Sequence, residues 1–301
     1  MEVIKINPRG YCQGVTRALD IVKNAVKNHH SEAIYLLGMI VHNQLINQAL
    51  TLENVKLLDD SKTKEQWIDE ITDGVIIISA HGVNPSLITK AKEKGLTVID
   101  ATCKYVNIAQ NLVVEYLSNG YDVLYIGEKN HPEAQGIITI NENKIHLIND
   151  SSNLDDLVII NDKIMVTTQT TMNYQSISSL FDRILAIFPS AIILDEICTA
   201  TRMRQQAVYS LKKQVDLLLV VGDKSSNNAK KLLEIGVMKN ISLVKLIGCI
   251  KDLQDFDLTD IESVAITSAA STPTYLTNQV IEYLEKYPDG EIVEYNLKEI
   301  L

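Results

Sequence analysis

Cysteine is scarce in this sequence, with four residues among 301, at positions 12, 103, 198 and 249. They are too few and too widely spread for a disulfide framework, and no C-x-x-C pair occurs, which leaves zinc fingers and thioredoxin-like redox motifs unsupported. An isolated cysteine is usually a small core residue. We assign this role to Cys249, which follows an apolar run.

Basic residues and long apolar stretches are scarce too. The chain has 28 Lys and Arg against 38 Asp and Glu, a net charge of −10, whereas sequence-independent nucleic-acid binding needs a basic surface. The longest wholly apolar runs, such as residues 217–221, are far too short to span a bilayer. The first residues lack the basic and apolar regions of a signal peptide. We therefore expect a cytoplasmic protein without a membrane or nucleic-acid partner.

Short apolar, β-branched runs alternate with helical patterns along the chain, which is typical of α/β proteins with largely parallel sheets. The expected strands are residues 3–6, 33–37, 74–78, 96–99, 122–126, 163–166, 191–194, 215–221 and 263–266. Apolar stripes with a helical period, such as Val15, Leu19 and Val22, indicate helices that pack on these sheets.

Three cysteines share one position in this alternation. Cys12, Cys103 and Cys198 each follow an expected strand and precede an expected helix, and they lie 91 and 95 residues apart. The positive end of a helix dipole favours a thiolate there. The spacing predicts three similar α/β units, which are residues 14–102, residues 103–197, and residues 198–285 with the strand segment 1–13, followed by a tail at 286–301.

Polar loops after other strands repeat with nearly the same period. They contribute His42 and His81 in the first unit, His131 and Thr170 in the second, and Ser225 and Ser271 in the third. Ligands of open α/β sheets bind beyond the carboxyl ends of the strands, where all these residues fall. Because no linker rich in Pro, Gly or Ser separates the units, we expect them to pack closely around a shared centre.

Three converging thiolates can hold a metal group and leave one coordination position open. On a [4Fe–4S] cluster, the open iron could bind and activate a substrate. On zinc, the open fourth site is the competing possibility. The residues alone leave both open.

The loops also carry groups suited to an anion. Imidazoles come from His42, His81 and His131, and hydroxyls, an amide and backbone N–H groups at helix starts come from Ser225, Ser226, Asn227 and Ser271. Together they are typical of a diphosphate site built without a P-loop, since neither G-x-x-x-x-G-K-[ST] nor G-x-G-x-x-G occurs. Taken singly, such serines are often only helix caps.

Glu133 is the best candidate for a general acid. It lies two residues after His131, and burial near bound phosphate would raise its pKa toward neutrality. Thr170 could position that acid or a substrate hydroxyl. The alternatives are a solvated Glu133 and a Thr170 that only caps its strand. Glu196 is a second carboxylate, better suited to support the helix after Cys198.

The motifs resemble, in order, those of the LytB family of 4-hydroxy-3-methylbut-2-enyl diphosphate reductases, which catalyse the last step of the methylerythritol phosphate route to isoprenoids. The resemblance spans residues 1–285. The matching segments are residues 10–15, 41–43, 80–83, 100–103, 131–133, 168–171, 197–198 with 201–205, 224–227 and 271–273.

The resemblance implies a trefoil of three α/β domains around a [4Fe–4S] cluster bound by Cys12, Cys103 and Cys198. Glu133 would supply protons, with Thr170 in the same relay. The allylic hydroxyl would leave as water with two electrons, giving isopentenyl and dimethylallyl diphosphate. The residues implied to hold the substrate are His42, His81, His131, Thr170, Ser225, Ser226, Asn227 and Ser271.

By the same resemblance, a small ferredoxin or flavodoxin would deliver the electrons, and we expect a monomer. Three positions depart from the family pattern. Lys104 stands where a Pro is typical, Gln110 replaces a His, and Ala269 replaces a Gly. Losing that Gly could tighten the backbone near the phosphate, because Ala is costly at unusual φ and ψ. None of these changes removes a ligand or the acid.

Other functions remain to be distinguished. An iron–sulfur hydro-lyase would expel hydroxide at an open iron without net electrons. A cluster-based sensor would need a DNA-binding element, and the sequence contains no basic helix-turn-helix-like segment. A zinc hydrolase would use the same thiolates with metal-bound water. Electron demand and metal content separate these possibilities from the reductase.

Overall fold

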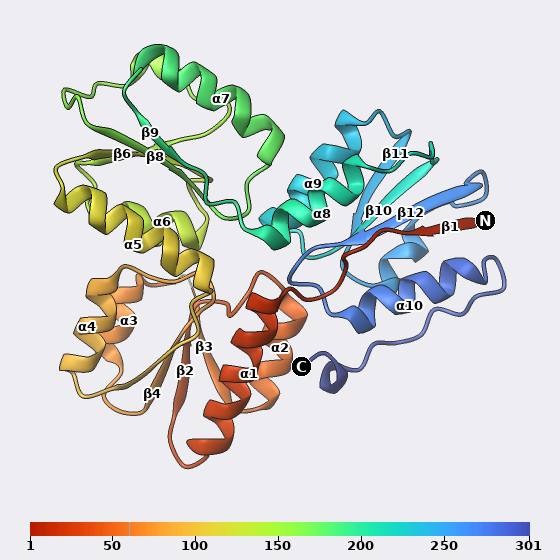
Figure 1. The fold of residues 1–301 in the computed structure, drawn as a ribbon. Coiled ribbons are helices and arrows are strands. Elements are labelled where there is room, and N and C mark those ends of the chain that lie inside the picture. Colours follow the sequence, from red (N-terminus) through yellow and green to blue (C-terminus); the bar gives the residue numbers. More distant parts are fainter. Residues whose placement is uncertain (60) are drawn as a thin grey trace. The chain divides into compact units, whose positions relative to one another are not determined.

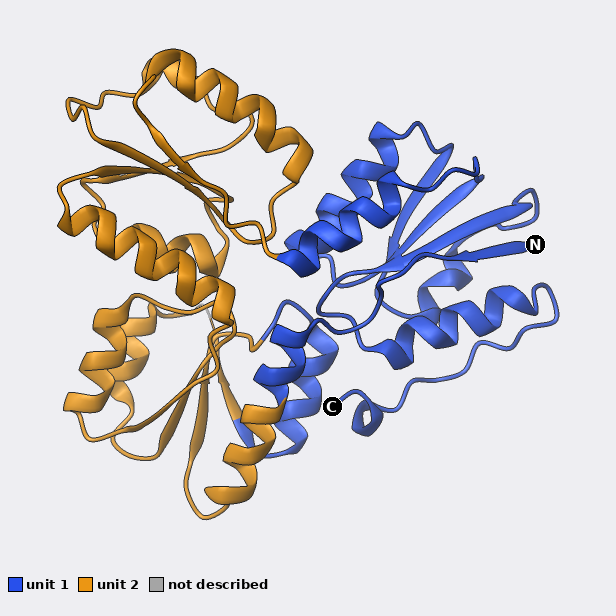
Figure 2. Ribbon diagram, in the orientation of Figure 1, with its two compact units in different colours: residues 1–19, 41–55, 199–301 blue, residues 20–40, 56–198 orange. Residues whose placement is uncertain are grey.

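A computed structural model describes residues 1–59 and 61–301. The chain divides into two compact units, which Figure 2 colours separately. Unit 1 comprises residues 1–19, 41–55 and 199–301, and unit 2 comprises residues 20–40 and 56–198. Helix α1 (Gln13–Asn28) begins in unit 1 and ends in unit 2.

Unit 1 contains one sheet, formed by β1 (Glu2–Lys5), β10 (Leu217–Val221), β11 (Leu243–Ile247) and β12 (Ser263–Ser268). Its further helices are α2 (Gln44–Leu52), α8 (Thr199–Tyr209), α9 (Asn227–Met238), α10 (Thr274–Glu285) and the 3-10 helices η2 (Ile250–Asp255) and η3 (Leu297–Glu299). Alternate residues of a strand face opposite sides of its sheet. Leu217 and Leu219 therefore pack against α10, whereas Leu218 and Val220 pack against α8 and α9. Both faces of the sheet are covered (Figure 1).

Unit 2 contains two sheets. Their strands are β2 (Ile34–Leu37), β3 (Val55–Leu58), β4 (Val75–Ile78) and β5 (Thr97–Asp100) in one, and β6 (Asp122–Ile126), β7 (Ile145–Ile148), β8 (Ile164–Thr168) and β9 (Ile192–Leu194) in the other. The helices are α3 (Lys64–Glu70), α4 (Pro85–Glu93), α5 (Lys104–Ser118), α6 (Pro132–Ile138), α7 (Tyr174–Ile187) and η1 (Leu154–Asp156). In the second sheet, Leu124 and Ile126 pack against α7, and Val123 and Tyr125 pack against α5 and α6.

All three sheets have the same strand order. The orders are β3-β2-β4-β5, β7-β6-β8-β9 and β11-β10-β12-β1. In the third sheet, the N-terminal strand β1 takes the place that β5 and β9 take in the others, and it pairs parallel with β12. The other recorded strand pairs are parallel as well. The prediction of three similar α/β units with parallel sheets is confirmed, and the domain boundaries stay a prediction.

The nine expected strands are confirmed to within two residues at each end, but three strands were not expected. These are β3, β7 and β11, and each forms the same edge of its sheet. Their sequences interrupt the apolar run with Lys56, His146 and Lys245. An edge strand can expose one polar side chain at little cost, so it lacks the continuous apolar signal of a central parallel strand.

Among the described residues, none of the helices is both long enough and apolar enough to cross a lipid bilayer.

The loop after β1 depends on a glycine, and this gives a testable prediction. Gly10 has φ of +76°, and a Cβ there would clash with Oγ1 of Thr274. Gly95 has a similar φ of +83°, but a Cβ there would meet nothing within 4 Å. Gly10→Ala should therefore reduce the free energy of unfolding by roughly 1–3 kcal/mol more than Gly95→Ala does. Urea unfolding followed by circular dichroism measures both, and equal losses would contradict the packing argument.

Candidate active site

Three cysteines occupy equivalent places in the three sheets. Cys12, Cys103 and Cys198 follow β1, β5 and β9, and each directly precedes a helix. Each backbone N–H donates to a carbonyl in the loop after the neighbouring strand: Cys12 to Ala270 at 3.1 Å, Cys103 to Ala80 at 3.0 Å and Cys198 to Thr170 at 3.1 Å. The predicted position at a strand end and a helix start is confirmed for all three.

The fourth cysteine has a different environment. Cys249 is buried, whereas the other three cysteines are only partly buried. Desolvation raises the pKa of the Cys249 thiol above its ordinary value, which disfavours the thiolate that binds metals. Its assignment to packing fits this burial.

Within unit 2, His131 and Glu133 stand at the start of α6. His131 is the N-cap residue, and its Nδ1 accepts a hydrogen bond from the Glu133 N–H at 3.2 Å. A neutral imidazole that accepts at Nδ1 carries its proton on Nε2. His131 can therefore donate from Nε2 to an anion.

The Glu133 carboxyl is buried and held on both oxygens. Oε1 accepts from the Thr170 N–H at 2.8 Å, and Oε2 pairs with the Thr170 hydroxyl at 2.8 Å. The Tyr125 hydroxyl lies 3.4 Å from Oε1. Burial raises the pKa of Glu133 to about 7, although hydrogen bonds from Thr170 and Tyr125 act in the opposite direction. Glu133 is thus not a solvated loop residue, and its proton is available near neutral pH.

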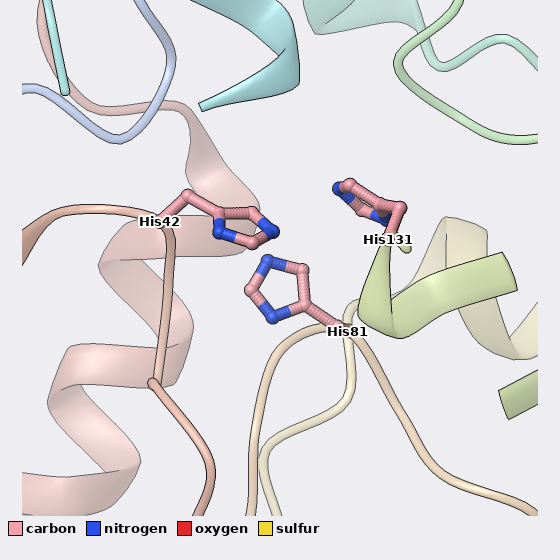
Figure 3. A group of neighbouring side chains, drawn as sticks. All are labelled: His42, His81 and His131. Atoms are coloured by element: carbon pink, nitrogen blue, oxygen red, sulfur yellow. The ribbon is translucent and has the colours of Figure 1, made fainter. Parts of the chain in front are cut away.

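His81 lies beside this group, in the loop after β4. Its ring packs edge-on against the His131 ring, with 5.5 Å between centroids and an interplanar angle of 90°. A ring nitrogen of His81 lies within 4.8 Å of one of His131 (Figure 3, which also draws His42 of unit 1). We call His81, His131, Glu133 and Thr170 the acid cluster.

Unit 1 gathers a second set of polar groups. The Asn43 side chain donates to the Ser271 carbonyl at 3.0 Å, and the Ser271 hydroxyl donates to the His42 carbonyl at 2.9 Å. These bonds join the loop before α2 to the loop after β12. We call His42, Asn43, Asp223, Ser225 and Ser271 the hydroxyl cluster.

Asp223 was not expected in this cluster. Its Oδ2 accepts from the Gln44 N–H at 2.8 Å, and its Oδ1 accepts from the Ser225 hydroxyl at 2.7 Å. Burial raises the pKa of Asp223, but these hydrogen bonds and the nearby His42 outweigh it, so the net pKa lies below the ordinary value. One feature of the sequence indicates this role: Asp223 lies two residues before Ser225, and an aspartate side chain often accepts a hydrogen bond from the backbone two residues further on.

Two further expected residues lie at the start of α9. The Ser226 side chain caps this helix by accepting from the Ala229 N–H at 3.4 Å, and Asn227 is the first helical residue. The helix-cap role considered for Ser226 is therefore present. A role of either residue in substrate binding stays a prediction.

The three departures from the family pattern have identifiable surroundings. Lys104 is the first residue of α5, and its Nζ lies 5.1 Å from the centre of the Tyr105 ring. The Gln110 side chain donates to the Val83 carbonyl at 3.0 Å, which fixes the loop that carries His81. Ala269 is not among the residues with positive φ, so the strain considered for this position is absent.

Comparison with known proteins covers nearly the whole chain. Residues 3–285 match the family model described as LytB protein. The chain belongs to the LytB family. The 4-hydroxy-3-methylbut-2-enyl diphosphate reductase of Lysinibacillus sphaericus (strain C3-41) is 40% identical over 292 residues, covering 97% of this chain and 90% of the relative.

Two further relatives of this LytB-family chain extend the comparison. The reductase of the same name from Listeria monocytogenes serotype 4b (strain CLIP80459) is 42% identical over 95% of this chain and 87% of its own. The solved structure of the E-1-hydroxy-2-methyl-but-2-enyl-4-diphosphate reductase from Plasmodium falciparum has a TM-score of 0.88 and 33% identity. It covers 96% of this chain and 89% of its own.

The raised pKa of Glu133 predicts a pH-dependent stability. Its pKa rises from 4.5 to about 7 on folding, so its stabilising contribution is complete below pH 4.5 and is lost as the pH rises through 7. Glu133→Gln keeps the shape and stays neutral. Between pH 5 and pH 8, the wild type should lose roughly 2–3 kcal/mol of unfolding free energy relative to this variant. Urea unfolding at both pH values tests this, and parallel pH profiles would contradict it.

Proposed function

We propose that this chain reduces 4-hydroxy-3-methylbut-2-enyl diphosphate to isopentenyl and dimethylallyl diphosphate, as the terminal enzyme of the non-mevalonate pathway. Relatives that are 40% and 42% identical to this chain carry the name of this reductase. The observation that carries the proposal is the buried carboxyl of Glu133, two residues after His131, whose pKa burial raises to about 7 and whose oxygens both pair with Thr170. Removing an allylic hydroxyl as water requires such a proton source beside an anion site.

The three equivalent cysteines fit a [4Fe–4S] cluster. Cys12, Cys103 and Cys198 are the partly buried cysteines, and each directly precedes a helix. Three thiolates match a cluster that keeps one iron open. When bound, the cluster would supply single electrons and Lewis acidity toward the leaving oxygen.

The resemblance implies which residues of each unit would bind the substrate. His42, His81 and His131 would donate to the diphosphate from their imidazoles. Ser225 and Ser271 now donate to Asp223 and to the His42 carbonyl, so each hydroxyl would turn to a phosphate oxygen on binding. Ser226 and Asn227 would add donors at the start of α9, where the helix dipole favours an anion.

Glu133 would deliver the protons through Thr170. The Thr170 hydroxyl pairs with Oε2 of Glu133, so it can accept the Glu133 proton while it passes its own proton onward. The reaction consumes two electrons and two protons, breaks the carbon–oxygen bond, and releases water. Orientation by the diphosphate site would lower the barrier further, because the reacting groups are already aligned.

The remaining partners rest on the resemblance. A ferredoxin- or flavodoxin-type protein would deliver the electrons, and the enzyme would act as a monomer in the cytoplasm. The net charge of −10 by itself indicates no particular docking surface.

Anaerobic turnover tests the proposed function. The protein is purified without air and mixed with a reduced one-electron dye, and dye oxidation is followed after adding the hydroxylated allylic diphosphate. We expect two equivalents of dye to be oxidised per substrate, with five-carbon diphosphate products. Absence of oxidation with an intact iron–sulfur spectrum would favour a hydro-lyase or sensor, and zinc without iron would favour a hydrolase.

The same assay tests the acid. Glu133→Gln should lower turnover at least about 100-fold, the usual loss on removing a general acid, and leave the cluster spectrum unchanged. Glu196→Gln is the matched control because Glu196 is a glutamate two residues before a proposed ligand, Cys198, and lies outside the acid cluster. It should keep near-wild-type turnover. Equal activity of the two variants would exclude Glu133 as the proton source.

A further inference from the structure

Tyr125 carries a buried hydroxyl group that has no role in the proposed reaction as described above. It lies on β6 with its ring among Val113, Ala134 and Ile137, on the face covered by α5 and α6, and it is fully buried. A Cβ at Gly127 would come within 2.9 Å of the ring, so the neighbouring backbone confines it closely. Its hydroxyl faces Oε1 of Glu133 at 3.4 Å.

The two oxygens of Glu133 have different partners. Oε1 receives the Thr170 N–H, which can only donate, and faces the Tyr125 hydroxyl. Oε2 faces the Thr170 hydroxyl, which can donate or accept. Both hydroxyls can accept a hydrogen bond from the neutral carboxyl. The Thr170 hydroxyl lies 2.8 Å from Oε2 and the Tyr125 hydroxyl 3.4 Å from Oε1, so the proton makes the shorter hydrogen bond on Oε2.

We propose that Tyr125 is a positioning residue that keeps Oε1 of Glu133 an acceptor and stabilises the carboxylate formed when the proton leaves Oε2. This inference rests on the proposed function for its catalytic meaning. The transfer is balanced: Oε2–H breaks, the Thr170 oxygen gains that proton, and the original Thr170 proton passes to the substrate side. The remaining negative charge is shared with Oε1, opposite Tyr125.

The distance between the Tyr125 hydroxyl and Oε1 of Glu133 indicates that Tyr125 stabilises the carboxylate more than the neutral acid. A separation of 3.4 Å is long for O–H···O, and such bonds shorten and strengthen when the acceptor is ionised. Tyr125 thus interacts more strongly with the carboxylate than with the acid, and only such a differential interaction speeds the step. The titratable groups around Glu133 are Tyr125 on β6, His131 at the start of the same helix α6, and His81 after β4, which packs on the His131 ring.

Tyr125→Phe tests the role because it keeps the ring and removes the hydroxyl. The infrared carboxyl band of Glu133, identified by subtracting the Glu133→Gln spectrum, is titrated in the anaerobic holoprotein. We expect the midpoint to move upward by about 0.5–1 pH unit, because a donor to the carboxylate is lost. Turnover at low pH should fall about 3- to 10-fold at unchanged KM, because the acid is weaker.

Tyr116→Phe is the matched control, since its ring packs against the same apolar cluster. It should move neither the midpoint nor the turnover. An unshifted midpoint in Tyr125→Phe, or the same shift in both variants, would overturn the proposal. The infrared result does not depend on turnover. A wild type that fails to oxidise the dye would overturn the proposed function. The infrared titration would still test the pairing of Tyr125 with Glu133.

A second measurement keeps the Tyr125 hydroxyl and changes its acidity. Uniform replacement of the tyrosines by 3-fluorotyrosine makes each phenol a stronger donor without removing it. The Glu133 midpoint should then move downward, opposite to the shift in Tyr125→Phe. A midpoint that does not move would overturn the proposal even if Tyr125→Phe fails to fold.

Discussion

The placement of each proposed ligand depends on one backbone hydrogen bond, from the N–H of the cysteine to the carbonyl of the loop after the adjacent parallel strand. Cys12, Cys103 and Cys198 all make this bond, with lengths between 3.0 and 3.1 Å. It lies beyond the ends of the paired strands and brings two strand-end loops together. Because the next residue starts a helix, the thiol is left at the helix N-terminus.

Burial of one carboxyl is the second constraint. Removing Glu133 from water costs free energy in its charged form, and the raised pKa is the result of that cost. Thr170 offsets part of it through both its backbone and its hydroxyl. Since the Thr170 carbonyl also accepts from Cys198, the same residue connects the proton source to a proposed ligand. The raised pKa of Glu133 lowers the free energy of unfolding at neutral pH, and it leaves Glu133 able to donate a proton there.

Much of this arrangement could be predicted from the sequence because it repeats. Apolar runs such as residues 75–78 locate central parallel strands, and a cysteine between strand and helix identifies a strand-end loop. The edge strands β3, β7 and β11 could not be found in this way, because exposure on one side allows a polar residue in each. Asp223 and Tyr125 were missed for another reason. Their roles depend on which partner lies opposite in three dimensions, and residue type alone does not specify that partner.

The central claim is that three particular cysteines, and not the fourth, bind one cluster with an open iron. Iron and sulfide are quantified in anaerobically purified wild type and in the four single Cys→Ser variants. The account predicts about four iron and four sulfide per wild-type chain, their loss in the variants of Cys12, Cys103 and Cys198, and their retention in Cys249→Ser. Retention of the full iron content in Cys103→Ser, or its loss in Cys249→Ser, would contradict it.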